Sequence, residues 1–239
     1  MGGHAMARLS LCLLGTFRVD LAGEPVTAFG YDKVRALLAY LTLEADRPHR
    51  REALAGLLWP EQPERNARQN LSQALFKLRG AIGDHEAKPP FLIITPQTLQ
   101  FNPSSAYELD VGTFTALLDA CQAHEHELLE LCNVCRDRLG EAVALYRGEF
   151  MAGFSLGDSS AFEEWSLLYR ERLGRLNLEA LHHLAGCYEA QGEYEQALEY
   201  AWRRVELDAW QEEAHQAVMR LLALNGQRES ALAQYQTCR

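Results

Sequence analysis

A repeat near the C-terminal end constrains the fold of this chain more than any other feature. The segment LAGCYEAQGEYEQALEYA spans residues 184–201, and VMRLLALNGQRESALAQY spans residues 218–235, 34 residues later. A glycine recurs at the same place in each segment, as Gly192 and Gly226, and an alanine follows each glycine five residues on. We expect the small alanine to let two helices pack closely and the glycine to close the turn between them. The sequence therefore predicts stacked helical hairpins.

A period of 34 residues is typical of tetratricopeptide repeats. Helical patterning begins at Asp110. Residues 110–123 and 138–147 are expected to form a degenerate first pair of repeat helices. Ser160 begins a predicted capping box at the start of the next long helix. We therefore predict an all-α tetratricopeptide-like domain over residues 107–239, with a generic helical bundle as the alternative. Such domains bind partners and carry no chemistry. Since the sequence stops within the last repeat helix, we also expect a fragment of a longer protein.

The N-terminal half has a different pattern. Residues 9–21 alternate apolar and polar side chains, which predicts a strand hairpin, and the period changes to that of a helix from Lys33. A short helix ending at Trp59-Pro60 and a third helix over 63–82 follow, and then a hairpin around Pro96-Gln97. This order predicts an α+β winged helix-turn-helix domain over residues 8–106.

The charge of the chain is divided unevenly between these halves. The formal net charge of −10 argues by itself against binding to nucleic acid, because phosphate binding needs cationic surface. Residues 1–106, however, hold 12 Lys/Arg and 10 Asp/Glu, whereas residues 107–239 hold 11 Lys/Arg and 23 Asp/Glu. From Arg65 to Arg79 there are four basic residues and no acidic one. The acidic side chains belong to the predicted helical domain, where we interpret them as solvated helix faces.

The polar face of the third helix carries side chains that suit DNA. Arginine, glutamine, serine and lysine recognise base edges or hold phosphates, and Phe76 is placed to touch a thymine methyl group. In the hairpin that follows, Thr95 and Gln97 are placed to reach sugar or phosphate. The alternatives are a solvated face of an ordinary α+β domain, or a protein-interaction scaffold whose winged helix binds protein.

The order of LLGTFRV, KVRALLAYL, LLWP and ARQNLSQALFKLR resembles the N-terminal part of the SARP-type transcriptional regulators. AVALYRGEF, FEEW and LALNGQRESALAQY resemble their bacterial transcriptional activator domain. The resemblance implies an OmpR-type winged helix whose third helix enters the major groove of double-stranded DNA, with the wing over the minor groove. It implies an activator that contacts RNA polymerase or another protein through its repeat domain. The positions carried over as DNA-facing are Arg68, Gln69, Ser72, Gln73, Lys77, Arg79, Thr95 and Gln97.

One departure from the OmpR-type pattern concerns the wing. Such wings usually carry an arginine, whereas the hairpin around Pro96-Gln97 offers threonine and glutamine.

Cysteine and histidine cluster between residues 121 and 135. Cys121-x-x-His124 and Cys132-x-x-Cys135 match the paired ligands of a structural zinc site. We predict these four residues as the ligands, with His126 as the substitute, and expect the metal to hold an insertion that is longer than a repeat turn. The alternative is that Cys121 is a core residue and the histidines are solvated.

Other classes of protein find little support in the sequence. No constellation of catalytic residues is present, and the chain lacks the Gly-rich phosphate loop of the type GxxxxGK[ST]. No apolar run approaches the roughly 18 to 20 residues that span a bilayer. We therefore expect a cytoplasmic, non-enzymatic protein that has no membrane partner. Its oligomeric state is not encoded in any motif.

Overall fold

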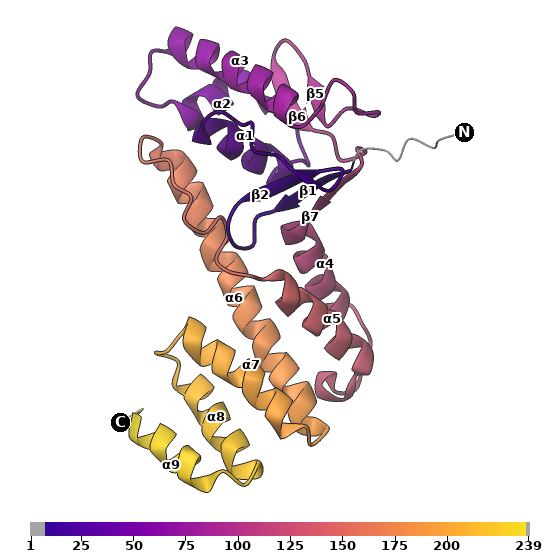
Figure 1. Ribbon diagram of the computed structural model, residues 1–239, viewed down its shortest axis with the longest axis vertical. Coiled ribbons are helices and arrows are strands. Elements are labelled where there is room, and N and C mark those ends of the chain that lie inside the picture. Colours follow the sequence, from indigo (N-terminus) through magenta and orange to yellow (C-terminus); the bar gives the residue numbers. More distant parts are fainter. Residues whose placement is uncertain (1–7, 238–239) are drawn as a thin grey trace, which may run out of the picture. The chain divides into compact units, whose positions relative to one another are not determined.

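The computed structural model describes residues 8–237. These residues form two compact units, one made of the chain up to Gly112 together with Gly148–Glu171, and one of Thr113–Arg147 together with the chain from Arg172. The predicted fold class is confirmed, since a mixed α/β region precedes an all-helical region of stacked helices (Figure 1). Within the described residues, no helix is both long and apolar enough to cross a membrane.

The first unit contains a four-stranded sheet in the order β3-β2-β1-β7, with β1 antiparallel to β2 and parallel to β7. Its strands are β1 (Leu9–Cys12), β2 (Arg18–Leu21), β3 (Glu24–Pro25) and β7 (Tyr107–Leu109). Ala22 and Gly23, which join β2 to β3, have φ values of 53° and 87°. Two positive φ values in a two-residue turn match the twist of a hairpin. The backbone conformation of Ala22 and Gly23 therefore suits the hairpin that they close.

Three helices and a second sheet complete the winged helix. They are α1 (Asp32–Leu43), α2 (Arg51–Leu58), α3 (Glu64–Ala81), β4 (His49–Arg50), β5 (Leu92–Ile94) and β6 (Thr98–Phe101), with the strands in the order β4-β6-β5. The apolar stripe predicted for α3 is buried: Ala67, Leu71, Ala74, Leu75, Leu78 and, just after the helix, Ile82. In Figure 1, α3 and the β1–β2 hairpin lie on different sides of α1. The buried stripe fixes which face of α3 is left for solvent.

Residues 148–171 pack with this first unit although they lie far along the sequence. Trp165 Nε1 and Tyr169 OH both donate hydrogen bonds to Glu44 Oε1, at 3.0 and 3.2 Å. The hydroxyl of Ser159 donates to the Leu57 carbonyl at 2.5 Å, and its oxygen accepts the Phe162 N–H at 3.4 Å. Ser159 therefore stands where Ser160 was predicted to begin the capping box, and the segment is anchored on α1 and α2.

The second unit is helical. Its elements are α4 (Asp110–Gln122), which begins in the first unit, a short 3-10 helix (Leu129–Leu131), α5 (Asn133–Leu145), the later part of α6 (Ser160–Ala190), α7 (Tyr194–Leu207), α8 (Glu212–Leu224) and α9 (Arg228–Thr237). Gly192 precedes α7 and Gly226 precedes α9, with φ values of 76° and 78°. Both glycines adopt the left-handed conformation that a tight turn requires. The repeat thus corresponds to two similar helix-turn-helix joints.

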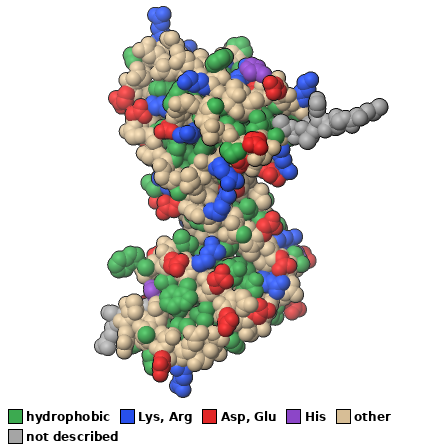
Figure 2. Space-filling view, in the orientation of Figure 1, with side chains coloured by type: hydrophobic (Ala, Val, Ile, Leu, Met, Phe, Trp, Pro, Cys, Tyr) green, Lys and Arg blue, Asp and Glu red, His purple; other side chains and the backbone are tan. Residues whose placement is uncertain are grey.

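Alanine and branched side chains fill the core of this repeat. The core residues are Ala197, Leu198, Ala201, Val205, Ala214, Val218, Leu221 and Leu222. On the surface shown in Figure 2, acidic side chains are scattered over the helical region and are not gathered in one patch. This distribution is that of solvated helix faces.

Candidate nucleic-acid interface

The exposed face of α3 is polar, with one large apolar side chain, Phe76, in its C-terminal half. Arg65, Gln69, Gln73 and Phe76 are exposed and recur at intervals of three or four residues, so they share one side of the helix. Phe76 is 78% exposed. Two amides, a guanidinium and an aromatic ring thus project from one helix face into solvent.

Arg68 lies at the edge of this face and is already paired. Its Nη2 atom lies 2.8 Å from Glu52 on α2 and 2.5 Å from Glu64 on α3. The hydroxyl of Ser72 donates to the Arg68 carbonyl at 3.0 Å, one turn below. Two carboxylates offset the charge of Arg68, so it must leave them before it can neutralise a phosphate.

Lys77 is held on the same side of the unit by an aromatic ring. Its Nζ atom lies 4.9 Å from the centroid of the Tyr31 ring, just before α1. The distance is that of a cation–π contact, and Lys77 is exposed. Lys77 therefore keeps its charge available at the surface.

Arg79 has a structural partner at the C-terminal end of α3. Its Nε atom donates to Asp84 Oδ2 at 2.8 Å, and its Nη2 atom lies 3.1 Å from His85 Nδ1. Asp84 is buried, and its other oxygen accepts the Leu92 N–H at 2.9 Å. This arrangement ties the end of α3 to β5, the first strand of the wing.

The tip of the wing is organised by Thr95. Its hydroxyl oxygen accepts the backbone N–H groups of Gln97 and Thr98, at 3.2 and 2.9 Å, so it holds the turn together. The Gln97 side chain is exposed. Both predicted wing residues are exposed, but the Thr95 hydroxyl is already engaged in the turn.

Two arginines that the sequence analysis did not single out lie beside the wing. Arg50 on β4 pairs with Thr98 across the sheet, and Arg51 donates to the Gln97 and Thr95 carbonyls at 3.0 and 3.1 Å. They supply the positive charge that the hairpin itself lacks. The only signal for them in the sequence is a dibasic pair where the second helix begins, because a two-residue strand is too short to show a period.

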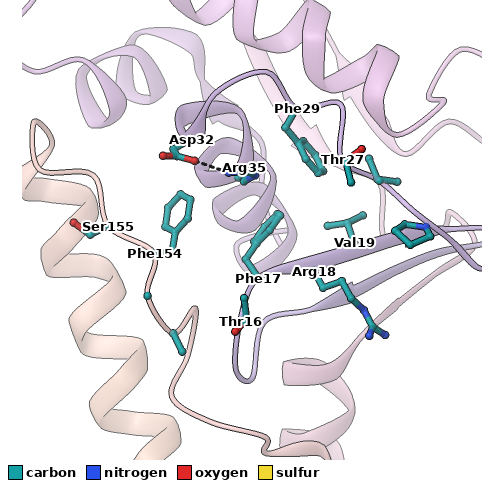
Figure 3. Close-up of a pocket in the computed structure, with 14 residues that line it drawn as sticks. Thr16, Phe17, Arg18, Val19, Thr27, Phe29, Asp32, Arg35, Phe154 and Ser155 are labelled. Carbon is teal, nitrogen blue, oxygen red and sulfur yellow. Dashed lines mark hydrogen bonds and ion pairs between the residues drawn. The ribbon is translucent and has the colours of Figure 1, made fainter.

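A cavity of about 540 Å³ in this unit is lined by polar, aliphatic and aromatic side chains (Figure 3). Phe17 stacks on Phe154 and meets Phe29 edge to face, with centroid distances of 6.1 and 5.7 Å. Arg35 on the same wall is paired with Asp32 at 2.6 Å. The charges of Arg35 and Asp32 thus satisfy each other.

The predicted metal ligands lie in the second unit, between α4 and α5. The structure brings together His124, His126, Cys132 and Cys135, whose ligand atoms all lie within 4.8 Å of one another, and this group could hold a metal ion. Cys121 lies outside the group, and its Sγ atom lies 3.6 Å from the Cys135 carbonyl. Three of the four predicted ligands are therefore gathered with the substitute, His126.

The two clustered thiols have different environments. Burial raises the pKa of Cys135 to about 12. The backbone N–H of Cys135 hydrogen-bonds to Cys132 and lowers the pKa of that thiol. Cys132 is thus the more readily ionised of the pair.

Comparison with known proteins finds a family model for the second half of the chain and curated relatives over part of it. Residues 109–239 match the family model of the bacterial transcriptional activator domain. The transcriptional regulatory protein EmbR from Mycobacterium bovis and from Mycobacterium tuberculosis is 37% identical over 85 residues, which cover 35% of this chain and 22% of EmbR. This chain therefore matches about a fifth of the length of these relatives.

A solved structure shows the same fold across both regions. The structure of Mycobacterium tuberculosis EmbR in complex with a low affinity phosphopeptide matches with a TM-score of 0.73 and 24% identity, over 97% of this chain and 59% of that one. The family model alone covers more than half of the chain. The chain therefore belongs to the bacterial transcriptional activator domain family, and over about a third of its length it is similar in sequence to the EmbR regulator.

Proposed function

We propose that this chain is a sequence-specific DNA-binding transcriptional regulator, acting as an activator, that places α3 in the major groove. The observation that carries the proposal is the exposed face of α3, where Arg65, Gln69, Gln73 and Lys77 project beside a wing flanked by arginines. A helix of this size fits the major groove of B-DNA, and amide side chains there pair with adenine in two hydrogen bonds. Residues 8–106 are the proposed DNA-binding domain, and residues 107–239 the proposed activator domain.

The predicted DNA-facing residues are assigned different roles according to the contacts that their side chains make within the protein. Gln69 and Gln73 are the proposed base-reading residues, and Phe76 is placed to meet a thymine methyl group. Lys77 and Gln97 are the proposed backbone contacts. The other four predicted residues have partners within the protein and contribute only after those contacts change: Arg68, Ser72, Arg79 and Thr95.

Regulators of this family imply both DNA and protein partners. We propose that the helical domain contacts RNA polymerase or another protein, since stacked helical repeats bind partners through extended surfaces. In this role the protein is no enzyme. A cytoplasmic location follows from the proposal, because a bacterial chromosome lies in the cytoplasm.

The test is selection of bound duplexes from a random library by the full chain, followed by affinity measurements over a range of salt concentrations. We expect a defined sequence to be enriched and the logarithm of affinity to fall steeply with the logarithm of salt, by about 0.9 per phosphate neutralised. Lys77→Ala should weaken binding to selected and random DNA alike and reduce that slope by about 1. Gln73→Ala should leave the slope unchanged and cost about 1 to 3 kcal/mol of sequence discrimination.

Arg18→Ala is the matched control. Arg18 is an exposed arginine on β2, which lies in the same unit as α3 but in the sheet that does not include the wing strands. It should leave DNA affinity and slope unchanged. Failure to enrich any sequence, with the protein folded by circular dichroism and a slope near zero, would overturn the proposal and favour the protein-interaction scaffold. Equal losses for Arg18→Ala and Lys77→Ala would show that charge alone, and not the face of α3, drives binding.

A further inference from the structure

We propose that His124, His126, Cys132 and Cys135 form a tetrahedral site for a structural zinc ion that holds the connection between α4 and α5. This inference goes beyond DNA binding and does not depend on it. It rests on the geometry of four side chains that come from two short segments of the second unit. The ligand set includes His126, not Cys121.

The distances between the ligand atoms are those of a tetrahedral zinc site. His124 Nδ1 lies 3.5 Å from Cys132 Sγ and 3.5 Å from Cys135 Sγ, and His126 Nδ1 lies 3.9 Å from Cys135 Sγ. Zinc bonds of about 2.3 Å to sulfur and about 2.0 to 2.1 Å to nitrogen, at tetrahedral angles, place sulfur and nitrogen about 3.6 Å apart. These three distances lie close to this value, and the ligand atoms of all four residues lie within 4.8 Å of one another.

The chemistry of the donors selects zinc. Two thiols and two imidazoles in a tetrahedral arrangement are the ligands of zinc sites, whereas magnesium and calcium prefer oxygen. Four protein ligands leave no open coordination position, which is characteristic of a structural site and not of a catalytic one. Cys135 is buried and the other three residues are half-buried, so the ion would lie beneath the surface of the connection.

The connection itself has little else to order it. None of the residues in its 3-10 helix, Leu129–Leu131, is buried, and Leu128 and Leu131 are 58% and 62% exposed. Its contact with α6 includes the Cys187 thiol, which lies 3.7 Å from the Leu129 carbonyl. A segment that buries so little apolar surface does not offset its conformational entropy, and a metal supplies that free energy.

Cys121, on the last turn of α4, is not among the residues whose ligand atoms all lie within 4.8 Å of one another. Its side chain is buried, and its sulfur lies against the Cys135 carbonyl. The histidines lie beyond the end of α4 at Gln122, where the backbone leaves the helix and can turn the rings toward the thiols. The structure therefore distinguishes two ligand sets that the spacing of the sequence left open.

The test is elemental analysis of the full chain purified without chelator, and of variants purified in the same way. We expect one zinc ion per chain in the wild type, and near zero in His126→Ala and Cys132→Ser. Cys121→Ala is the matched control and should keep its zinc. Reconstitution with cobalt supplies a second measurement, because two thiolate ligands give a charge-transfer band and tetrahedral cobalt gives strong visible bands.

A metal-free wild type that is folded by circular dichroism and shows no tetrahedral cobalt bands would overturn the proposal. Loss of zinc in folded Cys121→Ala with retention in His126→Ala would overturn the ligand set. If a variant fails to fold, the cobalt spectrum of the wild type still decides the coordination. Hydrogen exchange provides the structural check: stripping the metal should speed exchange over residues 124–135 and leave α3 unchanged.

Discussion

Replacing Arg79 with alanine tests whether this residue stabilises the winged helix or contacts DNA. The family resemblance assigns it to the DNA-facing set, whereas the structure pairs it with Asp84, a buried carboxylate that also accepts the Leu92 N–H. In the variant, Asp84 keeps only one of these two hydrogen bonds and loses its counter-charge. We therefore expect Arg79→Ala to destabilise the first unit.

The size of the effect follows from the burial of the two partners. Removing one partner of a fully buried pair costs about 3 to 5 kcal/mol. The Arg79 side chain is 32% exposed, so water can enter beside Asp84, and we expect a lower cost of about 2 to 3 kcal/mol. For a unit of this size, each kcal/mol lowers the melting temperature by about 3 to 5 °C, which gives a decrease of about 10 °C.

Calorimetry of the full chain measures the decrease, and hydrogen exchange at the Leu92 amide locates it. The double variant Arg79→Ala/Asp84→Asn is the control, because asparagine keeps an acceptor for Leu92 and removes the unpaired charge. It should recover at least about 1 kcal/mol relative to Arg79→Ala alone. At temperatures where it is folded, its salt slope for DNA binding should equal that of the wild type.

The reasoning is refuted if Arg79→Ala melts like the wild type and its DNA-binding slope falls by about 1, which is the behaviour of a phosphate contact.

Two further predictions follow from partners seen in the structure. Glu52→Gln removes one of the two carboxylates that pair with Arg68. DNA affinity should therefore rise, and the dependence of log affinity on log salt should steepen by up to about 0.9. An unchanged slope would show that Arg68 stays bound to Glu64. Leu198 and Leu232 occupy equivalent places in the repeat but are 7% and 65% exposed. In chemical denaturation of this 239-residue chain, Leu198→Ala should cost about 2 to 3 kcal/mol and Leu232→Ala less than about 0.5 kcal/mol. Equal costs would contradict the packing described for the repeat.

Elements with a regular local pattern could be predicted from the sequence. The stripe of α3, the end of α2 before Trp59-Pro60, the wing hairpin and the turns at Gly192 and Gly226 all match the structure. Each depends on side-chain spacing or on backbone restrictions within a few residues, and such information is present in a short window of sequence.

The division of residues between the two compact units could not be predicted in this way. Residues 148–171 follow the first helical pair in the sequence, yet they belong to the first unit through the contacts of Trp165 and Tyr169 with Glu44. These partners are more than 120 positions apart. No local period records a contact of that range.

By itself, the sequence determined the order of the elements, the exposed polar face of α3 and the kinds of ligand present between residues 121 and 135. Only the tertiary structure decided which of these side chains have partners: Arg68 with two glutamates, Arg79 with Asp84, and Cys132 and Cys135 with both histidines. The physical reason is that spacing specifies the face of a helix on which a residue lies. The packing of separate segments then decides what meets that face, and therefore whether a charge or a thiol is available to a ligand.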